Sequence, residues 1–290
     1  RTVSSAASDV YKRQVCINLA GGFRNGMEII LTGLDIEEKA KVFTEVLFNS
    51  VGGQEQFDEV FIELQRTDKE NPTTNEQAMA SLVISVKSSN QELVGRLFSA
   101  KIIELALANI PGFFAESGPK SSGPVIIYWP ALVDSKYITE KVHIDGKEIE
   151  VVPTSQLDYE EIYYQREPIS IDDIEISDQK EIYFGDLFGT RSGDKGGCAN
   201  LGVWAKNNLS YSFLYNFLTI EKLKELLPDL SEYKIERFEL PNINSLNFYI
   251  HDILEDGVSS NNRKDGQAKS LGEYLRVKKI LVPDSILLET

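Results

Sequence analysis

The sequence predicts an α+β protein made of two ferredoxin-like (βαββαβ) units that an acidic linker joins. Strand, helix, strand, strand, helix and strand patterns follow one another in residues 15–155. A similar order recurs in residues 181–290. Between the two, residues 156–180 are rich in Asp and Glu and have no apolar period, which is typical of a solvated linker.

The composition restricts the class of protein. The chain has 290 residues, 42% of them hydrophobic, which is enough for two folded domains. Its net charge of -15 argues against nucleic acid or an anionic membrane as a partner, because both require Lys and Arg to neutralise phosphates. Two cysteines and two histidines argue against a disulfide scaffold or a metal cluster. We therefore expect a cytoplasmic protein with no metal and no cofactor.

The first fourteen residues are expected to be foreign to the fold. Residues 4–14 read SSAASDVYKRQ, which is the in-frame translation of a transposase sequencing adapter; a disordered N-terminal arm is the alternative. We therefore expect residues 1–14 to be an artefact and genuine protein to begin near Val15. The upstream part of the gene is then expected to be missing.

The first unit, residues 15–155, opens with an expected strand at 27–32. Asp35 is expected to cap the following helix, with Glu38 at capping-box spacing. The remaining expected elements are strands at 57–65 and 82–86, a helix from Asn90 to Ile110, a short buried strand at 125–129 and a hairpin at 142–152 through Asp145 and Gly146.

The second unit, residues 181–290, is expected to begin with a strand followed by a glycine-rich loop. The further expected elements are a strand at 199–205, a helix capped by Thr219, strands at 233–240 and 246–253, a helix at 267–275 and a final strand at 279–282. The aromatic run at 211–217 is expected to be core or an interface stripe.

The chemistry concentrates in residues 185–202, which hold six of the 20 glycines. Glycine permits the backbone conformations that expose consecutive N–H groups, so we expect a loop that forms an anion-binding nest. Arg191 would grip a phosphate or carboxylate and Lys195 would add a point charge. The alternative is a hairpin in which an Arg191–Asp194 pair only fixes the turn. The segment has neither Walker nor dinucleotide-binding spacing.

Two further polar segments supply candidate contacts. Asn242, Asn244 and Asn247 lie at the mouth of a strand, although Asn also favours turns for local reasons. Asp265 and Lys269 enter the last predicted helix, where Asp265 is also a candidate N-cap.

The expected site combines these segments. Asp194 and Lys195 are the catalytic candidates. The substrate-binding candidates are Arg191, Ser192, Gly193, Gly196, Gly197, Asn200, Asn242, Asn244, Asn247, Asp265 and Lys269. Cys198 is expected to be an inert residue that starts a strand rather than a nucleophile, and His251 a structural histidine rather than a general base.

Three collinear segments, residues 189–204, 240–248 and 265–276, resemble the acyclic terpene utilisation (AtuA-like) family. They cover the family's C-terminal ferredoxin-fold domain. Residues 15–153 are similar to the end of its larger preceding domain, including the Gly21-Gly22-Phe23 step. The resemblance implies a protein linked to the breakdown of branched isoprenoid acyl-CoA compounds.

Two classes of function follow as hypotheses. The first is an enzyme that acts on a branched acyl-CoA or a related acid by lyase or hydratase chemistry, with Asp194 positioning Lys195 or acting as acid and base. The second is a non-catalytic assembly subunit of an acyl-CoA catabolic complex. Arg191 and Lys195 converging on a concave pocket would favour the enzyme, whereas a flat or paired surface would favour the assembly subunit. The expected partners are a small acidic or CoA-linked substrate and further copies of the chain in a homo-oligomer.

Overall fold

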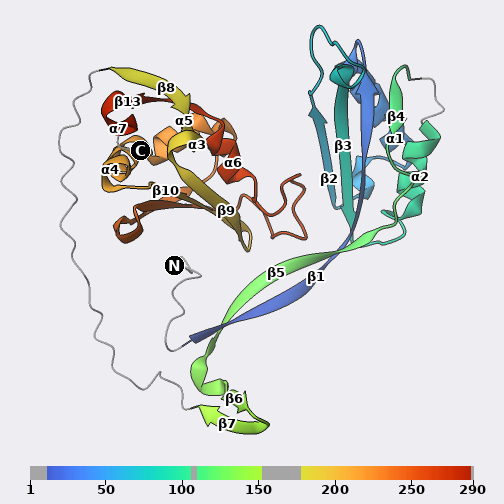
Figure 1. Cartoon of the computed structure of the whole chain (residues 1–290). Helices are drawn as coiled ribbons and strands as arrows, with labels where there is room; N and C mark the ends of the chain where they lie inside the picture. The colour runs from blue at the N-terminus through green and yellow to red at the C-terminus, as the bar shows by residue number, and fades with distance from the viewer. Residues whose placement is uncertain (1–11, 106–109, 152–177, 289–290) are drawn as a thin grey trace. The chain divides into compact units, whose positions relative to one another are not determined.

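A computed structural model describes residues 12–105, 110–151 and 178–288 of the chain (Figure 1). The chain divides into two compact units. One is Leu19–Ile127, and the other is Tyr128–Thr290 together with the N-terminal eighteen residues. Most of the expected acidic linker, residues 156–180, lies outside the described residues.

The unit Leu19–Ile127 contains an antiparallel sheet in the order β2-β3-β1-β4, with β5 also paired to β1. Its elements are β1 (Lys12–Thr32), α1 (Ile36–Ser50), β2 (Glu59–Gln65), β3 (Met79–Ser88), α2 (Arg96–Leu105), β4 (Phe113–Ala115) and β5 (Gly123–Asp134). Short 3-10 turns, Gln54–Gln56 and Glu76–Ala78, precede β2 and β3.

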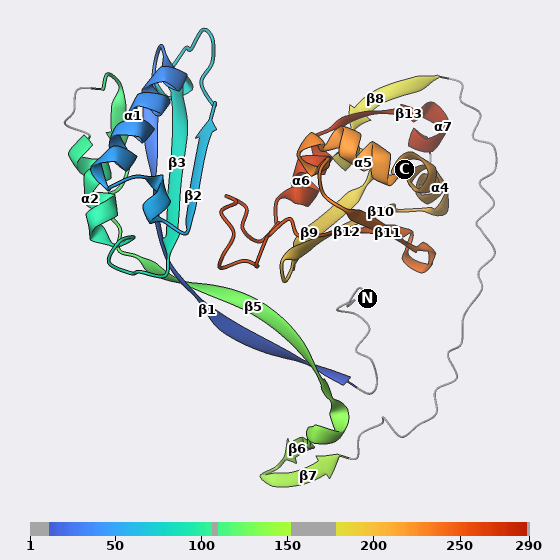
Figure 2. The ribbon, with the colours of Figure 1, turned by 180° about the vertical axis from the view of Figure 1, so that it is seen from behind.

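The core of this unit lies between the sheet and its two helices. Alternate residues of β3 point to opposite faces, and Leu82, Ile84 and Val86 are buried on the same one. They belong to one apolar cluster with Phe43 of α1 and Phe98 of α2. Figure 2 shows α1 against the sheet and α2 beside it.

Strand β1 is far longer than the strand expected at 27–32. It pairs with β3 from Phe23 to Thr32, and its earlier residues run beside β5 as a two-stranded ribbon (Figure 1). It begins at Lys12, so it includes the last residues of the segment expected to be an adapter. Gln14 Nε2 donates a hydrogen bond to the Tyr128 hydroxyl at 3.0 Å. The expected short strand at 125–129 is correspondingly extended, because β1 supplies its partner along the ribbon.

Two helix N-caps predicted in this unit, at Asp35 and Asn90, are not formed by the side chains expected to form them. Asp35 occupies the N-cap of α1, but its backbone has a φ of 56° and its side chain makes no capping hydrogen bond. The capping box with Glu38 is therefore not formed. Helix α2 begins at Arg96, because the Asn90 side chain instead accepts a hydrogen bond from the Glu92 N–H in a local turn.

The hairpin expected at 142–152 is confirmed. Strands β6 (Glu140–Ile144) and β7 (Lys147–Val151) are antiparallel, and Ile144 pairs with Lys147. The connecting Asp145 and Gly146 both have positive φ, as a two-residue hairpin turn requires. A 3-10 turn, Ser135–Tyr137, precedes β6.

The second unit contains a four-stranded antiparallel sheet in the order β11-β12-β10-β9 and a two-stranded sheet of β13 and β8. Its elements are β8 (Gln179–Tyr183), α3 (Phe184–Leu187), β9 (Gly189–Lys195), β10 (Cys198–Trp204), α4 (Asn208–Phe217), α5 (Ile220–Leu226), β11 (Ile235–Leu240), β12 (Ser245–Ile250), α6 (Leu271–Arg276), β13 (Lys279–Pro283) and α7 (Asp284–Leu287). The 3-10 turns Pro228–Leu230 and Pro241–Ile243 precede β11 and β12.

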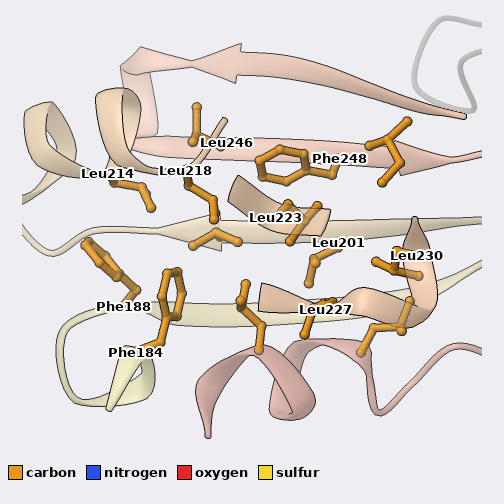
Figure 3. Close-up of a cluster of buried hydrophobic side chains, with 14 of the residues drawn as sticks. Phe184, Phe188, Leu201, Leu214, Leu218, Leu223, Leu227, Leu230, Leu246 and Phe248 are labelled. Atoms are coloured by element: carbon orange, nitrogen blue, oxygen red, sulfur yellow. The ribbon is translucent and has the colours of Figure 1, made fainter. Parts of the chain in front are cut away.

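The helices of this unit pack on one face of the four-stranded sheet. Leu201 and Phe248 point from the sheet into a cluster with Leu214, Leu218 and Leu223 from the α4–α5 region (Figure 3). Figures 1 and 2 show the helices between this sheet and the β8–β13 pair. The other face of the four-stranded sheet carries no described helix.

Helix α4 is an element that the sequence reading missed. Asn207 caps it by accepting a hydrogen bond from the Ser210 N–H, and Tyr211 and Leu214 are buried at helical spacing. Helix α5 does begin after Thr219, whose hydroxyl accepts from the Lys222 N–H as expected. The helix expected at 267–275 is α6, which is shorter than expected and begins at Leu271.

Candidate functional site on the sheet

The glycine-rich segment forms a β-hairpin rather than a loop. Strand β9 pairs with β10 from Gly189 opposite Trp204 to Lys195 opposite Cys198. Gly196, with a φ of 66°, turns the chain between them. Strand β9 does not form the expected nest of consecutive backbone N–H groups, because successive N–H groups of an extended strand point to opposite edges and do not converge.

Strand alternation divides the candidate residues between the two faces of the sheet. Ala199, Leu201 and Val203 of β10 are buried against the helices, so their neighbours Asn200 and Gly202 point the other way. We call this other side the open face. It carries Arg191, Gly193, Lys195, Asn200, Gly202, Trp204, Phe238, Asn247 and Tyr249.

One row of the open face crosses all four strands. Arg191 of β9 lies opposite Gly202, Gly202 opposite Asn247, and Asn247 opposite Phe238 of β11. Three strand spacings separate the two ends of the row, which is about 14 Å. A side chain at Gly202 would meet only the Arg191 carbonyl, 3.6 Å away, so the middle of the row is bare.

Cations gather at the β9 end of the row. Arg191 is exposed and has no hydrogen-bond or ion-pair partner among the described residues. Lys269 Nζ lies 3.3 Å from Asp194 Oδ1 and 2.8 Å from the place that a Cβ at Gly193 would occupy. Lys195 Nζ donates to the Asp194 carbonyl at 3.1 Å. Because β9 is an edge strand, Lys269 reaches around it to join this group.

Amide groups lie beside these cations. Asn200 projects from β10 between Gly193 and Tyr249, and its Oδ1 is buried without a hydrogen-bond partner among the described residues. An unpaired buried amide oxygen is costly, so a donor on a bound molecule would be stabilising here. Asn247 stands next to Gly202 in the row.

Three apolar side chains are exposed on the open face, Phe238 and Leu240 on β11 and Trp204 on β10. Trp204 is 43% exposed and Phe238 45% exposed, and Leu240 is also exposed. The Trp204 indole fills the space where a side chain at Gly189 would lie, which explains glycine at that position. The face is therefore cationic around Arg191 and Lys195 and apolar at Phe238 and Leu240 of β11, with the Trp204 indole lying over β9 near the cations.

A polar cluster closes the far corner of the open face. His251 Nε2 lies 2.7 Å from Glu236 Oε1, and this contact, with Lys234, lowers the pKa of Glu236. The Tyr249 ring meets His251 edge to face at 4.9 Å. Burial, a hydrogen bond with Cys198 and nearby acidic charge raise the pKa of Tyr249. Cys198 Sγ also accepts from the Asp252 N–H at 3.5 Å.

Comparison with known families decides what the chain is. Residues 4–144 match the model of the acyclic terpene utilisation family protein AtuA, and residues 183–281 match that of the AtuA ferredoxin-like domain. The chain is an AtuA-like protein with a ferredoxin-like domain. Searches of curated proteins and of solved structures give no match. The first match includes residues 4–14, the segment expected to be an adapter.

Several predicted site residues of the AtuA-like chain do not lie on the open face. Asp194 and Ser192 stand opposite the buried Ala199 and Leu201, so they point to the helix-covered face. Ser192 Oγ there accepts from the Gly272 N–H of α6 at 3.0 Å. Asp194 pairs with Lys269, not with Arg191 or Lys195, so neither the predicted Arg191–Asp194 turn pair nor the predicted positioning of Lys195 by the Asp194 carboxylate is seen.

The other predicted residues have structural positions. Asn242 is exposed in the turn between β11 and β12, and Asn244 ends that turn with a φ of 49° while its carbonyl accepts from Ala205 N–H. Gly197 packs against the Glu255 carbonyl. Asp265 does not cap α6 directly; it accepts from the Lys269 and Ser270 N–H groups and the Ser270 hydroxyl.

The sequence reading missed the aromatic part of the open face. Trp204 and Tyr249 alternate with buried residues along strands that were predicted, so the period-two pattern places them. Phe238 has no buried neighbour in β11, and only its pairing opposite Asn247 places it on the open face. In the described part of the chain, no His, Cys, Asp and Glu group of three or more could hold a metal ion. None of its helices has the length and apolar character to cross a membrane.

Proposed function

We propose that this AtuA-like protein acts in acyclic terpene utilisation by binding a branched acyl-CoA or related acid on the open face of its ferredoxin-like domain. The observation that carries the proposal is the row from Arg191 through Gly202 and Asn247 to Phe238. It presents an unpaired guanidinium, a bare backbone, an amide and an aromatic ring in that order.

The chemistry of the row matches an anion with an apolar chain. A guanidinium binds a carboxylate or phosphate in a two-pronged manner, and Lys195 and Lys269 add positive charge beside it. These cations stand out in a chain of net charge -15, where acidic groups able to pair with Arg191 are abundant. Phe238 of β11 offers apolar area about 14 Å away, with Leu240 on the same strand, a distance that suits a branched hydrocarbon chain. Trp204 adds an aromatic surface nearer to Arg191, on the neighbouring strand β10.

The geometry favours binding over acid–base chemistry by Asp194. That carboxylate points to the helix-covered face and is held by Lys269, so it does not stand beside a ligand on the open face. The exposure of Arg191 and Lys195 also favours the second candidate, a non-catalytic assembly subunit of an acyl-CoA catabolic complex. In both cases the same face recognises the ligand.

We infer further that the sheet of the first unit is a second ferredoxin-like unit. Helices follow β1 and β3, and the strand order is β2-β3-β1-β4 with antiparallel neighbours. In the second unit, β9 takes the edge position beside β10, so the cationic hairpin is an addition to the repeated pattern.

Isothermal titration of the whole chain with coenzyme A, a branched acyl-CoA and the matching free acid tests the proposal. Arg191→Ala should weaken binding about tenfold or more, because it removes a charge-assisted contact. Lys222→Ala on α5 removes the same charge far from the open face and is the matched control. Phe238→Ala should weaken the branched ligands more than coenzyme A. Equal affinity in wild type, Arg191→Ala and Lys222→Ala would rule the open face out.

A further inference from the structure

We propose that the ribbon of β1 and β5 is a dimerisation surface, and that its occupant is the same ribbon of a second copy of the chain. By the ribbon we mean residues 14–22 of β1 and residues 123–133 of β5. Val15, Ile17 and Leu19 lie on one face of β1, and all three are more than a third exposed. A two-stranded ribbon with apolar side chains in water is marginal by itself, so a further strand would stabilise it.

The ribbon is free of charge in a strongly charged chain. Residues 14–23 and 121–133 contain no Asp, Glu, Lys or Arg, although these types make up 26% of the sequence. Each copy carries a net charge of -15, so two copies repel one another over most of their surfaces. The ribbon is a surface on which two copies meet without like charges in contact.

The two edges of the ribbon differ in their ability to pair. The Tyr128 N–H donates to the Asp256 carbonyl, so it points away from β1. Pro124 and Pro130 lie an even number of residues from Tyr128 along β5, so their backbone nitrogens lie on the same outer edge. The outer edge of β5 therefore lacks two N–H donors, as protected edges do. The outer edge of β1 has no proline, and no described strand other than β5 pairs with it before Phe23.

A second copy fits this edge because a two-fold axis makes the pairing self-complementary. Two β1 strands that meet antiparallel across such an axis form a continuous four-stranded sheet, β5-β1-β1-β5. Val15, Ile17 and Leu19 of each copy then face the same residues of the other. The inference is independent of the open face, whose residues it does not use.

Light scattering coupled to size exclusion, over a dilution series of the whole chain, tests the inference. The wild type should approach twice the 32.6 kDa of one chain at high concentration. Ile17→Lys places a charge in the interface and should raise the dimer dissociation constant about tenfold or more. Leu97→Lys, on exposed α2, makes the same change outside the ribbon and should leave the dimer intact.

Hydrogen exchange of the wild type locates the contact without any substitution. The amides of residues 15–21 should be protected at high concentration and lose that protection on dilution. A wild type that remains a monomer overturns the proposal, even if another protein is found to bind the ribbon. A dimer that survives Ile17→Lys, or one whose residues 15–21 exchange equally at all concentrations, also overturns it.

Discussion

Gly202 leaves the middle of the open face without a side chain, where the proposed ligand would lie. It lies in the middle of β10, a position where glycine weakens a strand and a β-branched residue would fit the sheet. A Cβ there would find only ordinary contact, at 3.6 Å from the Arg191 carbonyl. The fold therefore gives no steric reason for glycine, whereas the proposed ligand along the row from Arg191 to Phe238 would give one.

The substitution Gly202→Val should separate an effect on folding stability from an effect on ligand binding. We expect the free energy of unfolding to change by no more than about 1 kcal/mol, since the new side chain meets open space on a strand. Ligand affinity should fall sharply, because the side chain fills the bare part of the row. Denaturant unfolding and titration measure the two quantities. Gly272→Val is the contrast: its Cβ would lie 2.7 Å from Thr190 Oγ1, so stability should fall. Unchanged affinity in Gly202→Val would contradict the proposed ligand path.

Asp265 illustrates a predicted site residue whose role is structural. Although partial burial would raise the pKa of this carboxyl, hydrogen bonds from the Ser270 side chain and from backbone N–H groups outweigh it and hold the pKa below the usual 3.8. A carboxyl with a lowered folded pKa contributes stability that is present above 3.8 and is lost as the pH falls through the folded pKa.

Asp265→Asn should therefore reduce the unfolding free energy at neutral pH and flatten its decline on acidification. The amide keeps one acceptor oxygen, so it satisfies fewer of the donors of Lys269 and Ser270. Denaturant unfolding from pH 7 to pH 3 measures both effects. A variant whose stability follows the wild-type curve over this range would show that the carboxylate does not hold the segment before α6.

At the level of elements, the sequence predicted most of the apolar strands, but missed the short apolar strand β4 at Phe113–Ala115 and the polar strand β9. Strand β10 alternates buried Ala199, Leu201 and Val203 with open-face residues, which the period-two pattern reveals. Strand β9 has no apolar residue, so no period marks it. It forms a strand because β10 supplies its hydrogen-bonding partner and α6 packs against it. Both are tertiary contacts, which the local sequence of β9 does not reveal. The predicted loop is therefore a hairpin, and whether it binds an anion stays a prediction.

Gly196 tests the hairpin directly. Its φ of 66° lies in the left-handed region, where an L-residue costs about 1–2 kcal/mol. Gly196→Ala should lower the unfolding free energy of the ferredoxin-like domain by about that amount. Gly118→Ala, at a position with no neighbour within 4 Å and no positive φ, should have little effect. Equal stability of the two variants in urea would mean that the turn between β9 and β10 is not held in this conformation.

At the scale of the whole molecule, the two apolar cores are separate. One cluster draws its residues from the range Phe23 to Ala115, and the other from the range Ile182 to Leu287. All the residues of the open face belong to the second range. The ferredoxin-like domain therefore has its own core and its own candidate ligand site, which is the condition for independent folding.

Residues 178–290, expressed alone, should consequently fold and bind. We expect a single cooperative unfolding transition, because every buried side chain of the second core lies within this fragment. The fragment should bind the branched acid with the affinity of the whole chain, since Arg191, Lys269, Asn247 and Phe238 are all retained. Circular dichroism during heating and titration of the fragment measure these outcomes. A fragment that folds but does not bind would place part of the ligand site outside the ferredoxin-like domain, and one that does not fold would show that residues before 178 complete its core.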